Sequence, residues 1–229
     1  MDKNVVTKID DLVNVKTVLI SVSDKTGLDA FIPQLVDLVP DITILSTGGT
    51  YNHLKDILGP KYANVLTQVS DYTGQPETQG GLVKTLDFKI YLGLLTETYN
   101  ENHQNDLQRT QAVAVDMAVV NLYPFRETIA KAGATPENAR GNIDIGGPCM
   151  IRAAAKNFIR VASVVNPSDY SLILDELESC QGKLPLKLRY ALAQKAFAHT
   201  AEYDAAIATY LGKTGFEKVL QCYQIKRLV

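Results

Sequence analysis

Short runs of apolar residues alternate along this chain with stretches in which apolar positions recur every three or four residues. Residues 17–22 (TVLISV) form the first run, and residues 42–45 (ITIL) form the second. Each run is followed by a polar loop and then by a helical pattern, at about 28–38 and 51–58. An unbroken apolar run is typical of a strand buried on both faces of a parallel sheet. Two such units in tandem predict parallel strands joined by right-handed crossovers.

Further apolar stretches continue this pattern towards the C-terminus. Residues 65–69 and 161–165 are short and contain several valines, which predicts two more strands. Residues 112–122 predict a strand that ends before Pro124, because proline cannot donate to a sheet. The Ala-rich region 186–211 predicts helix, either continuous or broken. The prediction is therefore an α/β fold with a mainly parallel sheet. We expect one domain with three parts, which are a core at about 17–165, a helical part at about 166–212 and a tail at 213–229, within 1–229.

Composition and charge narrow the possible partners. The chain has 229 residues, of which 46% are hydrophobic and 21% charged, with a formal net charge of −2. Because this charge is near zero and no Lys/Arg-rich run occurs, we expect neither nucleic acid nor an anionic membrane as a main partner. No apolar run has the length of a membrane span or of a signal-peptide core, so we expect a cytoplasmic location. The three Cys and three His residues are scattered, so neither a disulfide framework nor a metal site is expected.

The segment 143–157 (IDIGGPCMIRAAAKN) predicts a turn that leads into a helix. Pro148 suits the first helical position, since the N–H group it lacks would have no partner there. Arg152 and Lys156 share a helix face and repel each other unless an anion or a carboxylate lies between them. Asp144 is the nearest candidate. The alternative is a solvated basic end of a helix, stabilised by the helix dipole.

Two polar loops follow the first two predicted strands, and they carry groups that bind phosphate. These groups are hydroxyls, glycine N–H groups and one ammonium, from Ser23, Lys25, Thr26, Thr47, Gly48, Gly49 and Thr50. Open α/β sheets bind ligands at the carboxyl ends of their strands, where helix N-termini favour anions. The alternative is that some of these residues merely cap helices. Asp24 must point outward or pair with Lys25 if a phosphate binds here.

Six segments, in family order, resemble the IMP cyclohydrolase domain of the bifunctional purine-biosynthesis enzyme. They cover about residues 17–212 and are 21–28 (SVSDKTGL), 46–50 (STGGT), 80–86 (GGLVKTL), 121–125 (NLYPF), 143–157 and 195–201 (KAFAHTA). The resemblance implies a methylglyoxal-synthase-like, three-layer α/β/α fold with C-terminal helices. It also implies a homodimer without a cofactor. The implied reaction is the dehydrative closure of 5-formamidoimidazole-4-carboxamide ribotide (FAICAR) to IMP, the last step of de novo purine biosynthesis.

The chain departs from the family pattern at a few positions. Leu82 stands where the family has an arginine that is expected to contact the substrate, and Asp87-Phe88 stands in place of His-Pro. Lys89 is a candidate to replace that arginine. The family enzyme continues into a large formyltransferase domain, whereas this sequence stops at Val229. We therefore expect no formyltransferase activity, with a separate formyltransferase as a candidate partner.

The resemblance also suggests catalytic roles. Ring closure needs orientation, stabilisation of an oxyanion and proton transfer. We expect Lys84 to stabilise the developing oxyanion beside Thr85, and Tyr123 to relay a proton. Asp144 and Lys156 are expected to form a coupled acid/base pair. The heterocycle is expected to contact Asn121, Ile145 and Gly146.

Two rival functions remain open. One is a methylglyoxal-synthase-type lyase, which shares the phosphate loops but uses an Asp and His constellation that is not found in this sequence. The other is a non-catalytic or allosteric nucleotide-binding module of the same fold. Mixing the protein with FAICAR and following absorbance separates the three functions.

Overall fold

The computed structural model describes residues 5–75 and 85–226, and a parallel sheet lies at its centre. Within these residues the sheet has five strands in the order β4-β3-β2-β5-β6. The strands, all parallel, are β2 (Thr17–Ser21), β3 (Thr43–Ser46), β4 (Leu66–Gln68), β5 (Met117–Val120) and β6 (Ala162–Val164). Val18 of β2 lies between Ile44 of β3 and Met117 of β5. A small antiparallel pair joins β1 (Leu12–Asn14) to β7 (Lys183–Pro185).

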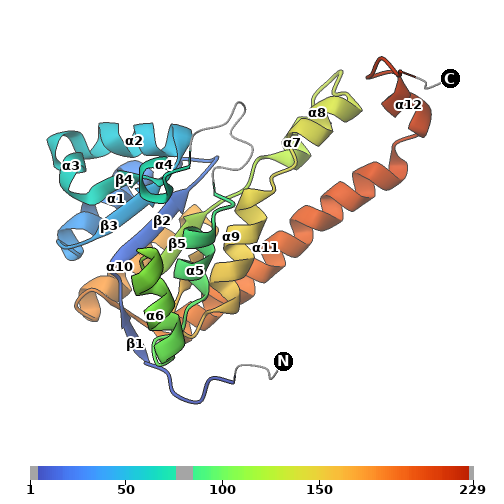
Figure 1. Ribbon diagram of the computed structural model, residues 1–229. Helices are drawn as coiled ribbons and strands as arrows, with labels where there is room; N and C mark the ends of the chain where they lie inside the picture. Colours follow the sequence, from blue (N-terminus) through green and yellow to red (C-terminus); the bar gives the residue numbers. More distant parts are fainter. Residues whose placement is uncertain (1–4, 76–84, 227–229) are drawn as a thin grey trace.

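Helices cover both faces of this sheet (Figure 1). Val18 and Ile20 face a core built with α1 (Leu28–Leu38), α2 (Gly48–Leu58) and α10 (Tyr170–Ser179). Leu19, which lies between them in β2, faces the opposite core with α5 (Phe88–Leu95) and α9 (Gly146–Lys156). This alternation is the period of two that a strand buried on both faces must have. The predicted mainly parallel α/β sheet is confirmed.

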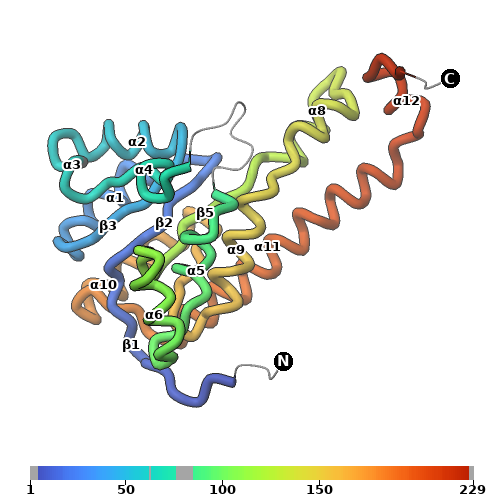
Figure 2. Tube along the Cα trace, in the orientation of Figure 1, coloured from blue at the N-terminus to red at the C-terminus, as the bar shows by residue number. Residues whose placement is uncertain are grey.

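The long helix α11 (Leu186–Lys213) connects the two cores. It packs against β6, with Leu188 and Leu192 in the first core and Ala193 and Ala196 in the second. It is continuous over 28 residues, which decides between the two alternatives left open by the sequence. Its C-terminal half runs away from the sheet beside α7 (Phe125–Ala130), and Figure 2 shows this projecting arm. The remaining helical elements are η1 (Gly59–Lys61), α3 (Tyr62–Val65), α4 (Val69–Thr73), α6 (Glu101–Thr110), α8 (Pro136–Gly141), η3 (Pro167–Asp169) and α12 (Phe216–Leu220).

Several of the predicted strands are shorter than expected. β4 covers only 66–68, because α3 and α4 flank it directly. The apolar stretch 112–122 is strand only over 117–120. Before that strand, Val115 donates its N–H to the carbonyl of Gly93 in α5, and a β-carbon on Gly93 would collide with the carbonyl of Val113. This part of the stretch therefore packs closely against a helix instead of extending the sheet.

None of the helices in the described part of the chain is both long and apolar enough to cross a membrane.

Candidate functional site

A pocket of about 400 Å³ opens at the carboxyl edge of β2, β3 and β5. Parallel strands end at the same edge, so loops that are distant in sequence meet there. The residues predicted from sequence that line it are Ser23, Lys25, Thr47, Gly48, Gly49, Thr50, Thr85, Asn121, Tyr123, Asp144, Ile145 and Gly146. The lining also includes residues that the sequence analysis did not select, which are Ser21, Val22, Leu86, Gly141, Ile143, Gly147 and Met150. Of these, Gly147 could have been identified from the sequence, since it adjoins Gly146 in the predicted turn.

The first pocket loop, between β2 and α1, is held by a side chain from the end of β5. The Asn121 Oδ1 accepts from the N–H groups of Ser23 (2.7 Å) and Asp24 (2.9 Å), and its Nδ2 donates to the Asp24 carbonyl (2.7 Å). The side chain of Asn121 therefore shapes the loop, and its contact with a heterocycle stays a prediction. Lys25 lines the pocket, with its Nζ 3.5 Å from the Ser23 carbonyl.

Asp24 and Thr26 form a separate pair in the same loop. The Asp24 carboxylate accepts from the Thr26 hydroxyl (2.6 Å) and the Thr26 N–H (2.9 Å), and these hydrogen bonds lower the pKa of Asp24. Thr26 therefore binds Asp24 and does not line the pocket, which differs from its predicted role in phosphate binding. The pairing keeps the exposed Asp24 carboxylate ionised and directed at Thr26, and Asp24 does not line the pocket.

The second loop, between β3 and α2, leaves a helix N-terminus open to the pocket. Thr50 is buried, with its hydroxyl accepting from the Val22 N–H (3.1 Å) and donating to the Val22 carbonyl (2.9 Å), so it fastens α2 to β2. The Thr47 hydroxyl lies 3.1 Å from that of Ser21. No side chain among the described residues caps α2, and Gly48 and Gly49 line the pocket at its first turn. Free N–H groups at a helix N-terminus attract anions.

The opposite wall is formed where α9 begins. The Asp144 Oδ1 accepts from the Gly147 N–H (2.8 Å), and the Tyr123 N–H is a second backbone donor to this carboxylate. Burial raises the pKa of Asp144, and the two donors oppose that shift. A β-carbon on Gly147 would collide with the Asp144 carboxylate, and one on Gly146 would collide with the Thr85 hydroxyl. The two glycines therefore let both polar side chains approach the start of the helix.

Lys156 does not join this wall, so the predicted pair of Asp144 and Lys156 is not formed within the chain. Lys156 is exposed at the last turn of α9, whereas Asp144 precedes the first turn. Ten residues of helix separate the two ends, a length of roughly 15 Å. The other basic residue of this helix face, Arg152, contacts α11, where its guanidinium lies 5.4 Å from the Phe197 ring centroid.

The segment that contains Lys84 and Leu82 lies outside the described residues, so the role of Lys84 stays a prediction. Lys89, the candidate substitute for the family arginine, does not line the pocket. Its Nζ donates to the Tyr72 carbonyl (3.4 Å) and lies 5.5 Å from the Tyr72 ring centroid. Asp87, at the other departure from the family pattern, caps α5 by accepting from the Lys89 N–H (2.7 Å).

The histidines and the sixth family segment lie away from the pocket. None of His53, His103 and His199, all of them in the described part of the chain, lines it. In the segment 195–201, the Lys195 ammonium pairs with the buried Asp169 carboxylate, which fixes α11 to η3. The described residues contain no group of three or more His, Cys, Asp or Glu that could hold a metal ion.

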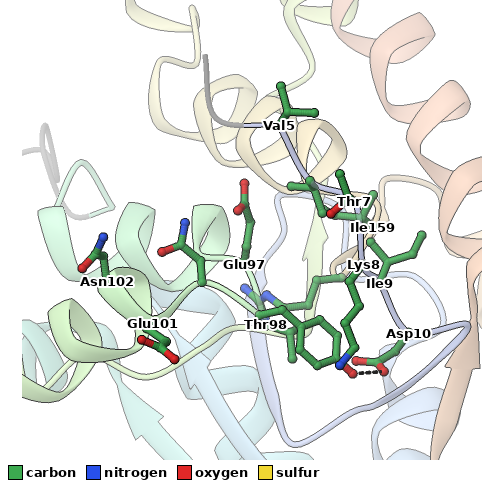
Figure 3. Close-up of a pocket in the computed structure, with 14 residues that line it drawn as sticks. Val5, Thr7, Lys8, Ile9, Asp10, Glu97, Thr98, Glu101, Asn102 and Ile159 are labelled. Carbon is green, nitrogen blue, oxygen red and sulfur yellow. Dashed lines mark hydrogen bonds between the residues drawn. The ribbon is translucent and has the colours of Figure 1, made fainter. Parts of the chain in front are cut away.

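A second pocket, of about 360 Å³, lies at the opposite edge of the sheet (Figure 3). It is lined by the segments 5–10 and 97–102 together with Ile159 and Arg160. Within it, the Tyr99 hydroxyl donates to the Asp10 carboxylate (2.6 Å), and the Lys8 Nζ lies 4.0 Å from the Tyr99 ring centroid. None of the residues predicted for the site lines this pocket.

Comparison with known proteins agrees with this geometry. The family model described as MGS-like domain matches residues 27–149, and the model described as AICARFT/IMPCHase bienzyme matches residues 154–228. The bifunctional purine biosynthesis protein PurH of Acidithiobacillus ferrooxidans is 47% identical over 197 residues, which are 86% of this chain and 36% of that protein. This chain therefore spans little more than a third of the length of that relative. A solved structure titled "Crystal structure of ForH" aligns with a TM-score of 0.75 and 32% identity, covering 87% of this chain and 98% of that one.

Proposed function

Because this chain belongs to the MGS-like domain family, and within it to the IMP cyclohydrolase type found in bifunctional purine-biosynthesis proteins, we propose that it closes the ring of FAICAR to give IMP and water. The observation that carries this proposal is a pocket that joins an open helix N-terminus, at Gly48 and Gly49, to the half-buried carboxyl of Asp144. The first feature suits the phosphate of a ribotide. The second suits proton transfer at its heterocycle.

At the phosphate end, we assign the anion to the space between Lys25 and the first turn of α2. Ser23, Thr47, Gly48 and Gly49 line this part of the pocket, and their hydroxyl and N–H groups are the proposed donors. A phosphate there gains charged hydrogen bonds and the favourable end of the helix dipole. The ribose and base then extend towards α9.

At the heterocycle end, the wall offers both a flat apolar contact and acid/base groups. Ile145 is exposed there and suits the face of the imidazole ring. Asp144 is the proposed acid/base, because its raised pKa brings the carboxyl closer to neutral pH. Tyr123 and Thr85 are the neighbouring hydroxyls. Lys84 is retained as the proposed oxyanion partner because it precedes Thr85 in the sequence.

These groups match the proton changes of the reaction. The carboxamide nitrogen attacks the formyl carbon, a C–N bond forms, and the nitrogen gives up one proton. The formyl oxygen takes up a proton and becomes a hydroxyl group. That hydroxyl leaves as water with the proton from the formamido nitrogen, which forms the new C=N bond. Asp144 can accept the first proton and return one to the leaving hydroxyl, so a single carboxyl can serve both steps.

The remaining expectations from the sequence are also proposals. They are a homodimer, activity without a cofactor, a cytoplasmic location, and a separate formyltransferase that supplies FAICAR. The lyase alternative is weakened by the absence of any of the three histidines from the pocket lining. The nucleotide-binding module remains the alternative that the experiment must exclude.

The test is IMP formation from FAICAR, followed by absorbance, with the wild-type protein and two Asp→Asn variants. Asp144→Asn should lower kcat by about 10²–10³-fold, as loss of an acid/base group does. Asp37→Asn is the matched control, because its carboxylate is 72% exposed on α1, where it pairs with Lys61. It should retain full activity. A wild-type protein that binds IMP but forms none would support the binding module, and production of methylglyoxal would support the lyase.

A further inference from the structure

Tyr203 lies near the middle of α11, and its side chain contacts the backbone of the pocket wall without lining the pocket itself. Its hydroxyl accepts from the N–H of Asp144 (2.9 Å) and donates to the carbonyl of Asn142 (3.1 Å). The side chain is 9% exposed, and its ring packs edge-on against Phe125 at 6.2 Å between centroids. Both hydrogen-bonding capacities of the phenol are therefore used on one short piece of backbone.

That piece of backbone connects α8 to α9 and carries Asp144. The N–H groups of Asn142 and Ile143 bond back to α8, at the carbonyls of Ala139 and Arg140. The N–H of the next residue, Asp144, belongs to neither helix, and it donates to the Tyr203 hydroxyl. A phenol that bridges the carbonyl of one residue and the N–H two residues later fixes the path of the backbone between them.

We propose that Tyr203 is a positioning residue, which holds the backbone at Asp144 so that the carboxylate stays at the pocket wall. The proposal rests on the proposed cyclohydrolase function, in which Asp144 transfers protons. Tyr203 touches the backbone of Asp144, so it acts on the reaction through Asp144.

If Tyr203 positions Asp144, its loss should change the pKa of the Asp144 carboxyl, which mere stabilisation of the fold would not do. The N–H groups of Gly147 and Tyr123 lower the pKa of Asp144, whereas burial raises it. If the backbone shifts, the carboxylate moves away from these donors and its pKa rises further. Titratable groups that interact with Asp144 in the described chain include the phenols of Tyr91 on α5 and of Tyr203 itself, and Tyr123 and Lys25 line the same pocket.

The experiment compares Tyr203→Phe with Tyr210→Phe. Tyr210 is a matched control because it lies two turns later on α11 and also packs edge-on against Phe125, at 5.9 Å. Its hydroxyl has no hydrogen bond in the described part of the chain. Both variants keep the aromatic ring, so a difference between them isolates the two hydrogen bonds of Tyr203.

For Tyr203→Phe we expect kcat to fall about tenfold with KM within about twofold, as misplacement of a reacting group does. The acidic limb of the kcat profile should move to higher pH, and amide hydrogen exchange over residues 142–147 should become faster. Tyr210→Phe should match the wild type in all three measurements.

Equal kcat and equal pH profiles for the two variants, in an active wild type, would overturn the proposal. Unchanged hydrogen exchange over 142–147 would also overturn it, without any measurement of activity. An inactive wild type would instead count against the cyclohydrolase function, and the exchange experiment would still report whether Tyr203 holds this connection.

Discussion

Adding one methyl group at Gly49 tests where the phosphate binds. Gly49 lies in the first turn of α2 and lines the pocket, and a β-carbon built on it meets no atom within 4 Å. The change Gly49→Ala therefore needs no rearrangement of the free protein. Because the space beside it is the proposed anion site, the same methyl should obstruct a bound phosphate.

Gly49→Ala should raise the stability of the fold and lower the affinity for IMP. Alanine in place of glycine within a helix should stabilise the fold by about 0.5–1 kcal/mol, which corresponds to a rise in Tm of about 1–4 °C for a chain of this size. Loss of one charged hydrogen bond from the phosphate costs about 1.5–3 kcal/mol, so the affinity for IMP should fall about 10- to 150-fold.

Gly212→Ala is the matched control for this experiment. Gly212 is also helical, on α11, and a β-carbon there also meets no atom within 4 Å, but it lies outside the pocket. It should raise Tm without changing IMP affinity, measured by titration calorimetry. If Gly49→Ala binds IMP as tightly as Gly212→Ala does, the phosphate does not lie over α2, and the proposed orientation of the ribotide is wrong.

Two further predictions concern stability. Arg160→Met should lower the free energy of unfolding by about 3–5 kcal/mol, because it leaves the Asp116 carboxylate largely buried without its cationic partner at 3.1 Å; a loss below 1 kcal/mol in chemical denaturation would contradict this. Asp144→Asn should be more stable than the wild type at neutral pH but not at acidic pH. Burial raises the pKa of Asp144 in the folded chain, so wild-type stability is lost as pH rises from the ordinary aspartate pKa through the raised value. An equal difference in unfolding free energy between the two proteins at both pH values would refute this.

The hydrophobic pattern predicted the sheet and the pocket loops because both depend on local signals. The two strand–loop–helix units place Lys25 and Gly48 at the same edge of the sheet without any knowledge of side-chain contacts. The MGS-like match and the likeness to ForH agree with the fold class predicted from this pattern. Helical spacing gives the face on which Lys156 lies but not which end of the helix meets a ligand. The predicted pair with Asp144 therefore does not form within the chain, where Lys156 lies at the opposite end of α9.

Contacts between distant parts of the chain could not be predicted in this way. Asn121 was proposed to contact the heterocycle, yet its amide binds backbone almost a hundred residues earlier in the chain. Tyr203 lies 59 residues from its partner Asp144 and has no local motif that marks it. A single sequence shows which polar groups exist, whereas their pairing depends on how the sheet is assembled.

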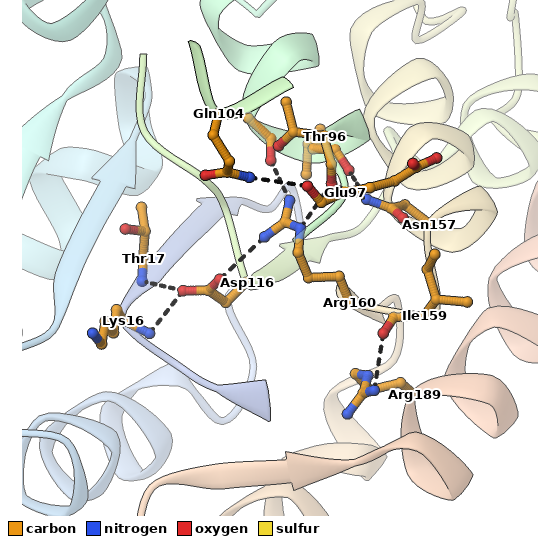
Figure 4. Close-up of polar contacts among 12 residues, drawn as sticks. Lys16, Thr17, Thr96, Glu97, Gln104, Asp116, Asn157, Ile159, Arg160 and Arg189 are labelled. Carbon is orange, nitrogen blue, oxygen red and sulfur yellow. Dashed lines mark hydrogen bonds and ion pairs between the residues drawn. The ribbon is translucent and has the colours of Figure 1, made fainter. Parts of the chain in front are cut away.

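The two edges of the sheet use their polar groups differently, and this contrast supports the carboxyl edge as the binding site. At the amino edge, the Arg160 guanidinium donates to the carbonyls of Thr96 and Gly93 as well as to Asp116, and Asp116 also accepts from the N–H groups of Lys16 and Thr17 (Figure 4).

Near that edge, the guanidinium of Arg189 likewise has all of its nitrogens hydrogen-bonded to the protein. It is fully buried, and its three nitrogens donate to carbonyls of the N-terminal segment, of β7 and of the turn before β6. Buried charges need such complete satisfaction, and groups that are satisfied in this way have nothing left for a ligand. At the carboxyl edge, by contrast, Gly48, Gly49 and Lys25 line an open pocket, and no side chain of the described residues caps the first turn of α2. Donors that the protein itself leaves unpaired at a helix N-terminus are suited to an anion, which supports the proposed phosphate site at this edge.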